Sequence, residues 1–194
     1  VRPMTIFGNF GSSSTLSTIH QLNFGNFEIN NFYSVDTDGT TVIDGESDVF
    51  RMFNTPVHIN IDNLLIKNVA KRFIKTQERC MLNVNNCYTS LDSRFTRSVN
   101  HIGTFEAQAV NQVTPSEFHF NTLEVDYSAA ANNPILFNAS GDDHEFTVDH
   151  LRYKNISIYS SAQNIKVHIN DAQGVGLNIT ATSSTKVVIK GLKD

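Results

Sequence analysis

A short motif that recurs along the chain predicts an all-β fold: a right-handed parallel β-helix, in which the chain forms a solenoid of rungs of roughly 20 residues each. Three observations support this prediction. The motif returns at nearly regular spacing, each copy alternates apolar and other residues as a short strand does, and almost no stretch shows the amphipathic spacing of a helix. Residues 64–79 are the one segment where a helical pattern competes, and we interpret them as strands.

The motif reads apolar, any, apolar, two mostly small or polar residues, and often apolar again. Its copies begin at Phe27, Leu64, Leu82, Phe105, Leu123, Phe146, Val167 and Val187. Successive copies are 18 to 23 positions apart except for a first gap of 37, where residues 42–44 supply the strand of a weaker rung. This constant phase predicts eight stacked copies rather than unrelated strands.

A second apolar segment follows several copies, at residues 135–137, 156–159 and 175–179, so each rung holds at least two strands. A rung this short cannot enclose a core, and its inward residues must stack on those of the next rung. A Greek-key or jelly-roll sandwich also uses many short strands, but it gives no reason for one motif to stay in phase. We therefore favour the β-helix.

The chain is expected to form one domain over residues 1–194, with 1–14 as an irregular lead-in or capping segment and 15–194 as rungs. It begins with Val and shows no charged and apolar leader, so we interpret it as a fragment of a longer chain. No apolar run approaches the ~18 residues of a membrane span. The formal net charge of -4 argues against a nucleic-acid partner, because phosphate binding requires a basic surface.

The sequence suggests neither a cofactor nor a metal site. Cys80 and Cys87 lack zinc-site spacing and are predicted to be buried thiols. The acidic segments at residues 36–48 and 141–145 contain oxygen ligands of the kind that calcium prefers, but they miss the spacing of an EF-hand loop. Polar loops between rungs are the favoured interpretation of both segments.

Four carboxylates form the candidate catalytic set. If the first and third motif residues point inward, the second and fourth point to solvent, and equivalent positions stack about 4.8 Å apart. On this register one face carries four acids over three consecutive rungs: Glu106, Glu124, Asp126 and Asp149. Residues expected to contact a ligand near them are Lys67, Gln108, Tyr127 and His168.

Neighbouring carboxylates raise one another's pKa, which suits one of them to act as a general acid. Glycoside hydrolysis uses two carboxyls, about 5 Å apart for retention and about 6.5 to 9.5 Å apart for inversion. A solvated acidic strip with no catalytic role is the alternative. The sequence leaves both interpretations open.

Asparagine at the fifth motif position, in Asn31, Asn68 and Asn86, resembles the asparagine turn of pectate-lyase-like β-helices. A polar, tryptophan-free chain of this pattern resembles the body of a bacteriophage tailspike or tail-fibre protein. The resemblance implies a homotrimer, an extracellular place on the virion tail, and binding or cleavage of bacterial capsule or O-antigen. Lys67, or Lys71 with Arg72, would neutralise an acidic sugar in a lyase.

The alternative function is non-catalytic: a structural or receptor-binding β-helical spike or adhesin. A free-living enzyme of the pectinase type is less favoured, because the chain has neither a leader nor a recognisable basic catalytic motif.

Overall fold

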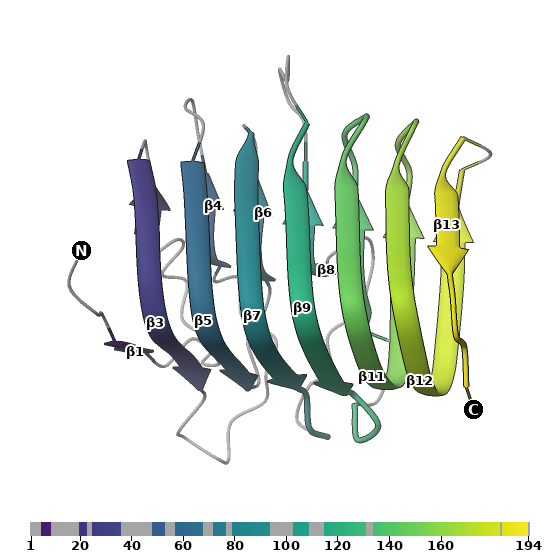
Figure 1. The fold of residues 1–194 in the computed structure, drawn as a ribbon, viewed down its shortest axis with the longest axis horizontal. Helices are drawn as coiled ribbons and strands as arrows, with labels where there is room; N and C mark the ends of the chain where they lie inside the picture. Colours follow the sequence, from purple (N-terminus) through teal and green to yellow (C-terminus); the bar gives the residue numbers. More distant parts are fainter. Residues whose placement is uncertain are drawn as a thin grey trace.

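A computed structural model describes residues 5–8, 20–22, 25–35, 48–52, 57–67, 72–76, 79–93, 103–108, 115–130, 134–182 and 184–193. Within these ranges there is no helix, and all thirteen strands belong to one strongly curled sheet in which every strand pair is parallel (Figure 1). The prediction of an all-β chain of parallel strands is confirmed, and the curl is compatible with a β-helix. The described residues hold no helix of the length and apolarity that crossing a membrane takes.

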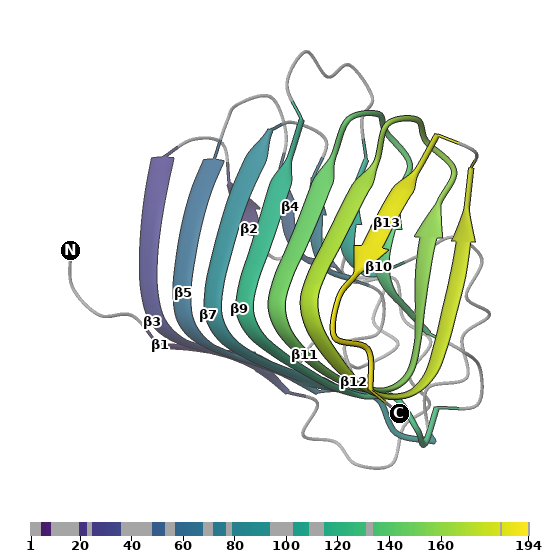
Figure 2. The same cartoon turned by 45° about the vertical axis from the view of Figure 1, so that its right-hand side comes forward.

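Six long strands form one side of the curl, and the second halves of two of them, β11 (Glu145–Ser160) and β12 (Lys166–Ala181), continue round to the other side (Figure 2). The other four are β3 (Gly25–Val35), β5 (Val57–Lys67), β7 (Cys80–Ser90) and β9 (Glu117–Asp126). In β5, buried residues alternate from Val57 to Ile61, two exposed residues follow, and burial resumes at Leu64. Two successive outward residues break the period of two, so the strand must bend there for both halves to bury their apolar side.

The remaining strands are short. They are β1 (Thr5–Gly8), β2 (His20–Leu22), β4 (Asp48–Met52), β6 (Arg72–Thr76), β8 (Gly103–Ala107), β10 (Ile135–Ala139) and β13 (Lys186–Ile189). β2, β4, β6, β8 and β10 pair in that order on the opposite side of the curl, and β10 pairs with the second half of β11. The chain therefore alternates between the two sides.

The predicted register is confirmed for Phe146, Val167 and Val187, which pair in one row, and it is wrong for other copies. Leu82 pairs with Ile59 and Phe118, not with Leu64, which pairs with Phe32 and Cys87 in a separate row. Apolar positions alternate both before and after the bend of a long strand, so the motif fits either half. The prediction therefore placed copies from different rows in one series. Phe105 belongs to neither row, because it lies in β8 on the opposite side.

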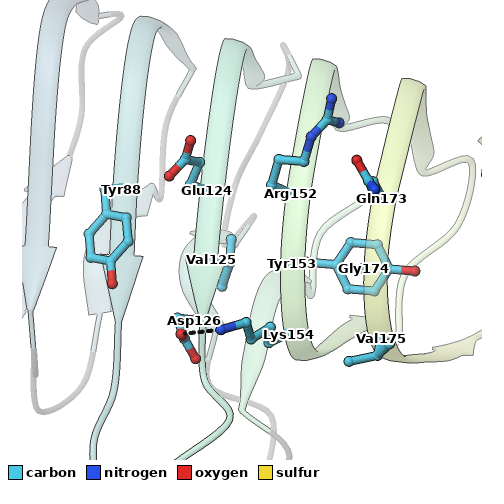
Figure 3. A pocket seen from close by; sticks show the side chains of 10 residues that line it. All are labelled: Tyr88, Glu124, Val125, Asp126, Arg152, Tyr153, Lys154, Gln173, Gly174 and Val175. Atoms are coloured by element: carbon cyan, nitrogen blue, oxygen red, sulfur yellow. Dashed lines mark hydrogen bonds and ion pairs between the residues drawn. The ribbon is translucent and has the colours of Figure 1, made fainter. Parts of the chain in front are cut away.

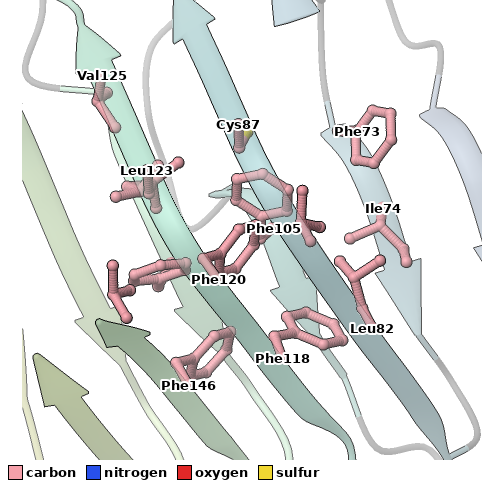
Figure 4. Close-up of a cluster of buried hydrophobic side chains, with 14 of the residues drawn as sticks. Phe73, Ile74, Leu82, Cys87, Phe105, Phe118, Phe120, Leu123, Val125 and Phe146 are labelled. Atoms are coloured by element: carbon pink, nitrogen blue, oxygen red, sulfur yellow. The ribbon is translucent and has the colours of Figure 1, made fainter. Parts of the chain in front are cut away.

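The core fills the space between the two sides (Figure 4). Phe105 from the short-strand side meets Phe120 from β9 with ring centroids 4.7 Å apart, and it also contacts Phe73 and Phe137 at 5.9 and 6.0 Å. Most of these rings meet edge-on or tilted, arrangements that add to the stabilisation from area burial. The core thus joins strands from both sides.

Asparagine side chains stack between neighbouring long strands. Asn63 donates to Asn31 at 3.2 Å, and Asn86 donates to Asn63 at 3.1 Å, forming an amide ladder at the bend. Asn31 and Asn86 therefore lie in one row, as predicted. The third predicted member, Asn68, and the weak rung at 42–44 lie outside the described residues.

Candidate functional site

The outer face of the long strands carries a groove of about 460 Å³, in which charged and amide side chains lie beside apolar surface (Figure 3). It is lined by Tyr88, Glu124, Val125, Asp126, Arg152, Tyr153, Lys154, Gln173, Gly174 and Val175. A second hollow, of about 300 Å³, shares Tyr88 and Glu124 with it and continues to Leu65 on β5. Together they form one groove that crosses the strands from β5 to β12.

Strand alternation turns these side chains outward. In β9, Val125 points into the core while Glu124 and Asp126 on either side of it point to the groove. The register places Glu124 between Tyr88 and Arg152, and it places Asp126 between Ser90 and Lys154. The groove therefore has an acidic strand, β9, beside a basic strand, β11.

Gly174 lines the groove at β12. A Cβ atom at this position would overlap the carbonyl oxygen of Tyr153 on the neighbouring strand. Only glycine allows this close approach of the two backbones.

Both basic side chains of the groove have an aspartate partner. Lys154 Nζ lies 3.0 Å from Asp126, whose pKa is lowered first by a hydrogen bond from the Ser128 side chain and then by Lys154. Arg152 Nη1 lies 3.0 Å from Asp171 on β12, and the pKa of Asp171 is lowered mainly by that hydrogen bond. Both aspartates are therefore ionised at neutral pH.

Glu124 is different. Its exposed carboxylate forms no ion pair or hydrogen bond with the part of the chain that the structure describes, since Arg152 turns away from it toward Asp171 (Figure 3). On the other flank of Glu124 lies the ring of Tyr88. Lys67 Nζ lies 5.9 Å from the centroid of that ring, a cation–π distance.

The expected set of four carboxylates on one face is not formed, because Glu106 lies on β8 on the opposite side of the curl. Glu106 is buried, and its Oε2 accepts hydrogen bonds from Arg72 Nε at 2.6 Å and Asn138 Nδ2 at 3.0 Å. A buried carboxylate held by an arginine and an amide has the environment of a structural ion pair.

Asp149 shares the outer face but lies outside the groove. It accepts hydrogen bonds from Asn170 at 2.9 Å and contacts His119 Nε2 at 3.0 Å. Partial burial on its own would raise the pKa of this carboxyl, but the two hydrogen bonds outweigh burial and lower it. His168 lies on the same face, level with Thr147 of β11.

Two further predicted ligand contacts do not line the groove. Tyr127 is fully buried, and its hydroxyl lies 2.6 Å from Thr104 Oγ1 and 3.2 Å from Thr89 Oγ1, while burial raises its pKa. Gln108 follows β8, where its backbone N–H donates to the Thr76 carbonyl at 2.9 Å. Of the predicted site residues, the groove thus contains Glu124 and Asp126, and Lys67 lies next to it.

No three or more His, Cys, Asp or Glu side chains of the described ranges are grouped to hold a metal ion. The acidic segment at 141–145 forms a turn, in which Asp142 accepts a hydrogen bond from the Gln163 N–H at 2.7 Å. Residues 36–47 of the other acidic segment lie outside the described residues. Cys80 and Cys87 are buried as predicted, and burial raises both pKa values, which makes the thiols unreactive.

The site prediction omitted Arg152, Lys154 and Gln173 and gave no special place to Tyr88. A signal for them exists in the sequence: each long strand carries two adjacent outward residues at its bend, such as Asn85 with Asn86 and Asn170 with Asp171. Aligning the strands on these pairs brings Tyr88, Glu124, Arg152 and Gln173 into one row.

Comparison of the chain with protein-family models, curated proteins and solved structures finds no match.

Proposed function

We propose that this protein binds a bacterial surface polysaccharide, of capsule or O-antigen type, in the groove that crosses the strands from Leu65 to Gln173. The observation that carries the proposal is the length and lining of this groove. Five neighbouring strands at about 4.8 Å spacing offer a path of roughly 19 Å, enough for several units of a linear polymer. The side chains along it combine an aromatic ring with amide and charged groups.

These groups suit a sugar chain. Tyr88 offers an apolar ring face, and Gln173 offers both hydrogen-bond donors and acceptors for hydroxyl groups. The row of side chains follows the strand spacing, so an extended ligand would meet one side chain of the row at each strand. We further propose that the curled sheet is part of a right-handed β-helix of the tailspike type, which acts as an extracellular homotrimer on a virion tail.

Calorimetric titration with purified capsule and O-antigen oligosaccharides tests the binding. Tyr88→Ala is expected to weaken affinity several-fold, through loss of ring contact. Met81→Ala, on the same strand but outside the groove, is the control and should bind as the wild type does. Equal affinity of Tyr88→Ala and wild type, or no binding of any oligosaccharide, would refute the proposal.

A second candidate function is hydrolysis of the bound polysaccharide. Glu124 and Asp126 project from the same side of β9 into the groove. The backbone advances about 6.7 Å over two residues of a strand, and inverting glycosidases hold their two carboxyl groups about 6.5 to 9.5 Å apart. The low pKa of Asp126 suits the general base, and in this second candidate Glu124 would be the general acid, protonated only in the complex with the polysaccharide.

Release of reducing ends from the same polysaccharides decides between binding and hydrolysis. A hydrolase would release them with inverted anomeric configuration, detectable by NMR, and Glu124→Gln would stop the release. A pure binding protein would release none, and this outcome would remove the second candidate while leaving the first.

A further inference from the structure

We infer that the groove is selective for a glycan that carries a free amino group, with the ammonium held between the Glu124 carboxylate and the Tyr88 ring. This inference rests on the polysaccharide binding proposed above and names the chemical class of the ligand. It starts from the charge balance of the groove lining.

The lining holds two acids and two bases, but the bases are already neutralised. Lys154 is 3.0 Å from Asp126, and Arg152 is 3.0 Å from Asp171, which lies beside the groove. Glu124 is therefore the one acid of the lining that has no basic partner among the described residues, while Lys67, next to the groove, lies over the Tyr88 ring. Its carboxylate is exposed and has no hydrogen-bond or ion-pair partner in the described ranges, so a ligand can reach it without breaking a contact.

The position of Tyr88 adds a second preference for a cation. The ring faces the groove next to Glu124, and both residues line both hollows. The Lys67 ammonium lies 5.9 Å from the ring centroid, so this ring already has one cation near it, and a ligand ammonium would occupy the side of the ring toward Glu124. A carboxylate beside an aromatic ring attracts a primary ammonium through both charge and cation–π interaction.

The ligand must also present the ammonium on an extended backbone, because the groove continues on both sides of Glu124, to Leu65 and to Gln173. An amino sugar within a linear chain meets both requirements. Its N-acetylated form does not, because acetylation removes the charge and adds bulk at the nitrogen.

The test compares a β-1,4-linked glucosamine oligomer with the N-acetylated oligomer of the same length, by calorimetric titration at about 0.15 M salt, where long-range attraction is screened. We expect the amine-bearing oligomer to bind at least about tenfold more tightly. Glu124→Gln should abolish this preference. Glu117→Gln, the same substitution at an exposed position on the same strand but outside the groove, should keep it.

Equal binding of the two oligomers, or tighter binding of the N-acetylated one, would overturn the amine selectivity and leave the polysaccharide function standing. A preference that persists in Glu124→Gln would also overturn it, since diffuse charge would then be the cause. If neither oligomer binds and the capsule and O-antigen panel also fails, both the inference and the proposed function fall.

Discussion

At the scale of single residues, the environment of each carboxylate decides what it can do. Glu106 and Glu124 are both strand glutamates, yet one is buried against Arg72 and the other faces an open groove. Their substitution should therefore have opposite consequences: loss of stability in one case and loss of ligand binding in the other.

Glu106→Gln is expected to lower the free energy of unfolding by about 3 to 5 kcal/mol, because it removes the carboxylate from a buried ion pair with Arg72. Urea unfolding followed by circular dichroism measures this. Glu124→Gln, exposed and unpaired within the described ranges, is the control and should change stability by less than about 0.5 kcal/mol. A stable Glu106→Gln protein would contradict a structural role for this ion pair.

His144 predicts a dependence of stability on pH. Its ring is buried, its Nδ1 accepts a hydrogen bond from the Ser116 N–H at 2.9 Å, and its Nε2 has no partner among the described residues. Burial lowers its pKa from 6.5 to about 4, an effect that Asp143 and Asp142 offset in part. The unfolded chain therefore takes up the proton first, and stability falls as the pH drops from 6.5 toward 4.

The loss attributable to His144 is expected to reach about 3 kcal/mol at pH 4. His144→Gln keeps an acceptor for the Ser116 N–H but does not titrate, so its unfolding free energy should depend less on pH in this window. His58→Gln, at an exposed position, should retain the wild-type dependence. Identical pH profiles for wild type and His144→Gln would exclude this histidine as the cause.

At the scale of elements, the bend in each long strand is stabilised from outside by the amide ladder. Asn63 is its middle member, because it both donates to Asn31 and accepts from Asn86. Asn63→Ala is therefore expected to cost about 1 kcal/mol, a modest loss since these groups are exposed. Thermal unfolding measures this loss. The control is Asp62→Ala, at the exposed neighbouring position, which should lower the free energy of unfolding by less than about 0.5 kcal/mol. Equal effects of the two substitutions would argue against the ladder.

The strands themselves could be predicted from the sequence, since alternation of apolar residues is a local property. Their alignment could not, because the motif of Leu82 to Cys87 fits either half of a bent strand equally well. Which half stacks on which depends on contacts between residues far apart in sequence. This ambiguity placed Glu106 beside Glu124 in the predicted site, whereas the structure separates them.

At the scale of the whole molecule, the protection of backbone amides from hydrogen exchange is expected to vary along the curl. β9 and β11 are paired on both sides and enclose the aromatic core, whereas β13 pairs only with β12. Large apolar side chains exposed in the described ranges also gather near this end, at Val175, Ile179 and Leu192. Hydrogen exchange should therefore be slowest in β9 and β11 and fastest in β13 and the second half of β12. Uniform exchange would show instead that the curl opens as one unit.

The constant register between neighbouring strands has a practical consequence. Asn85 and Asn121 are hydrogen-bonded neighbours 36 positions apart, while Asn164 and Ser184 bond across 20 positions. The length of chain between turns thus varies widely while the packed strands stay aligned, and extra length in such a connection carries a small entropic cost. Foreign peptides inserted into these connections should therefore be tolerated. The curl could then serve as a scaffold that displays new recognition segments without redesign of its interior.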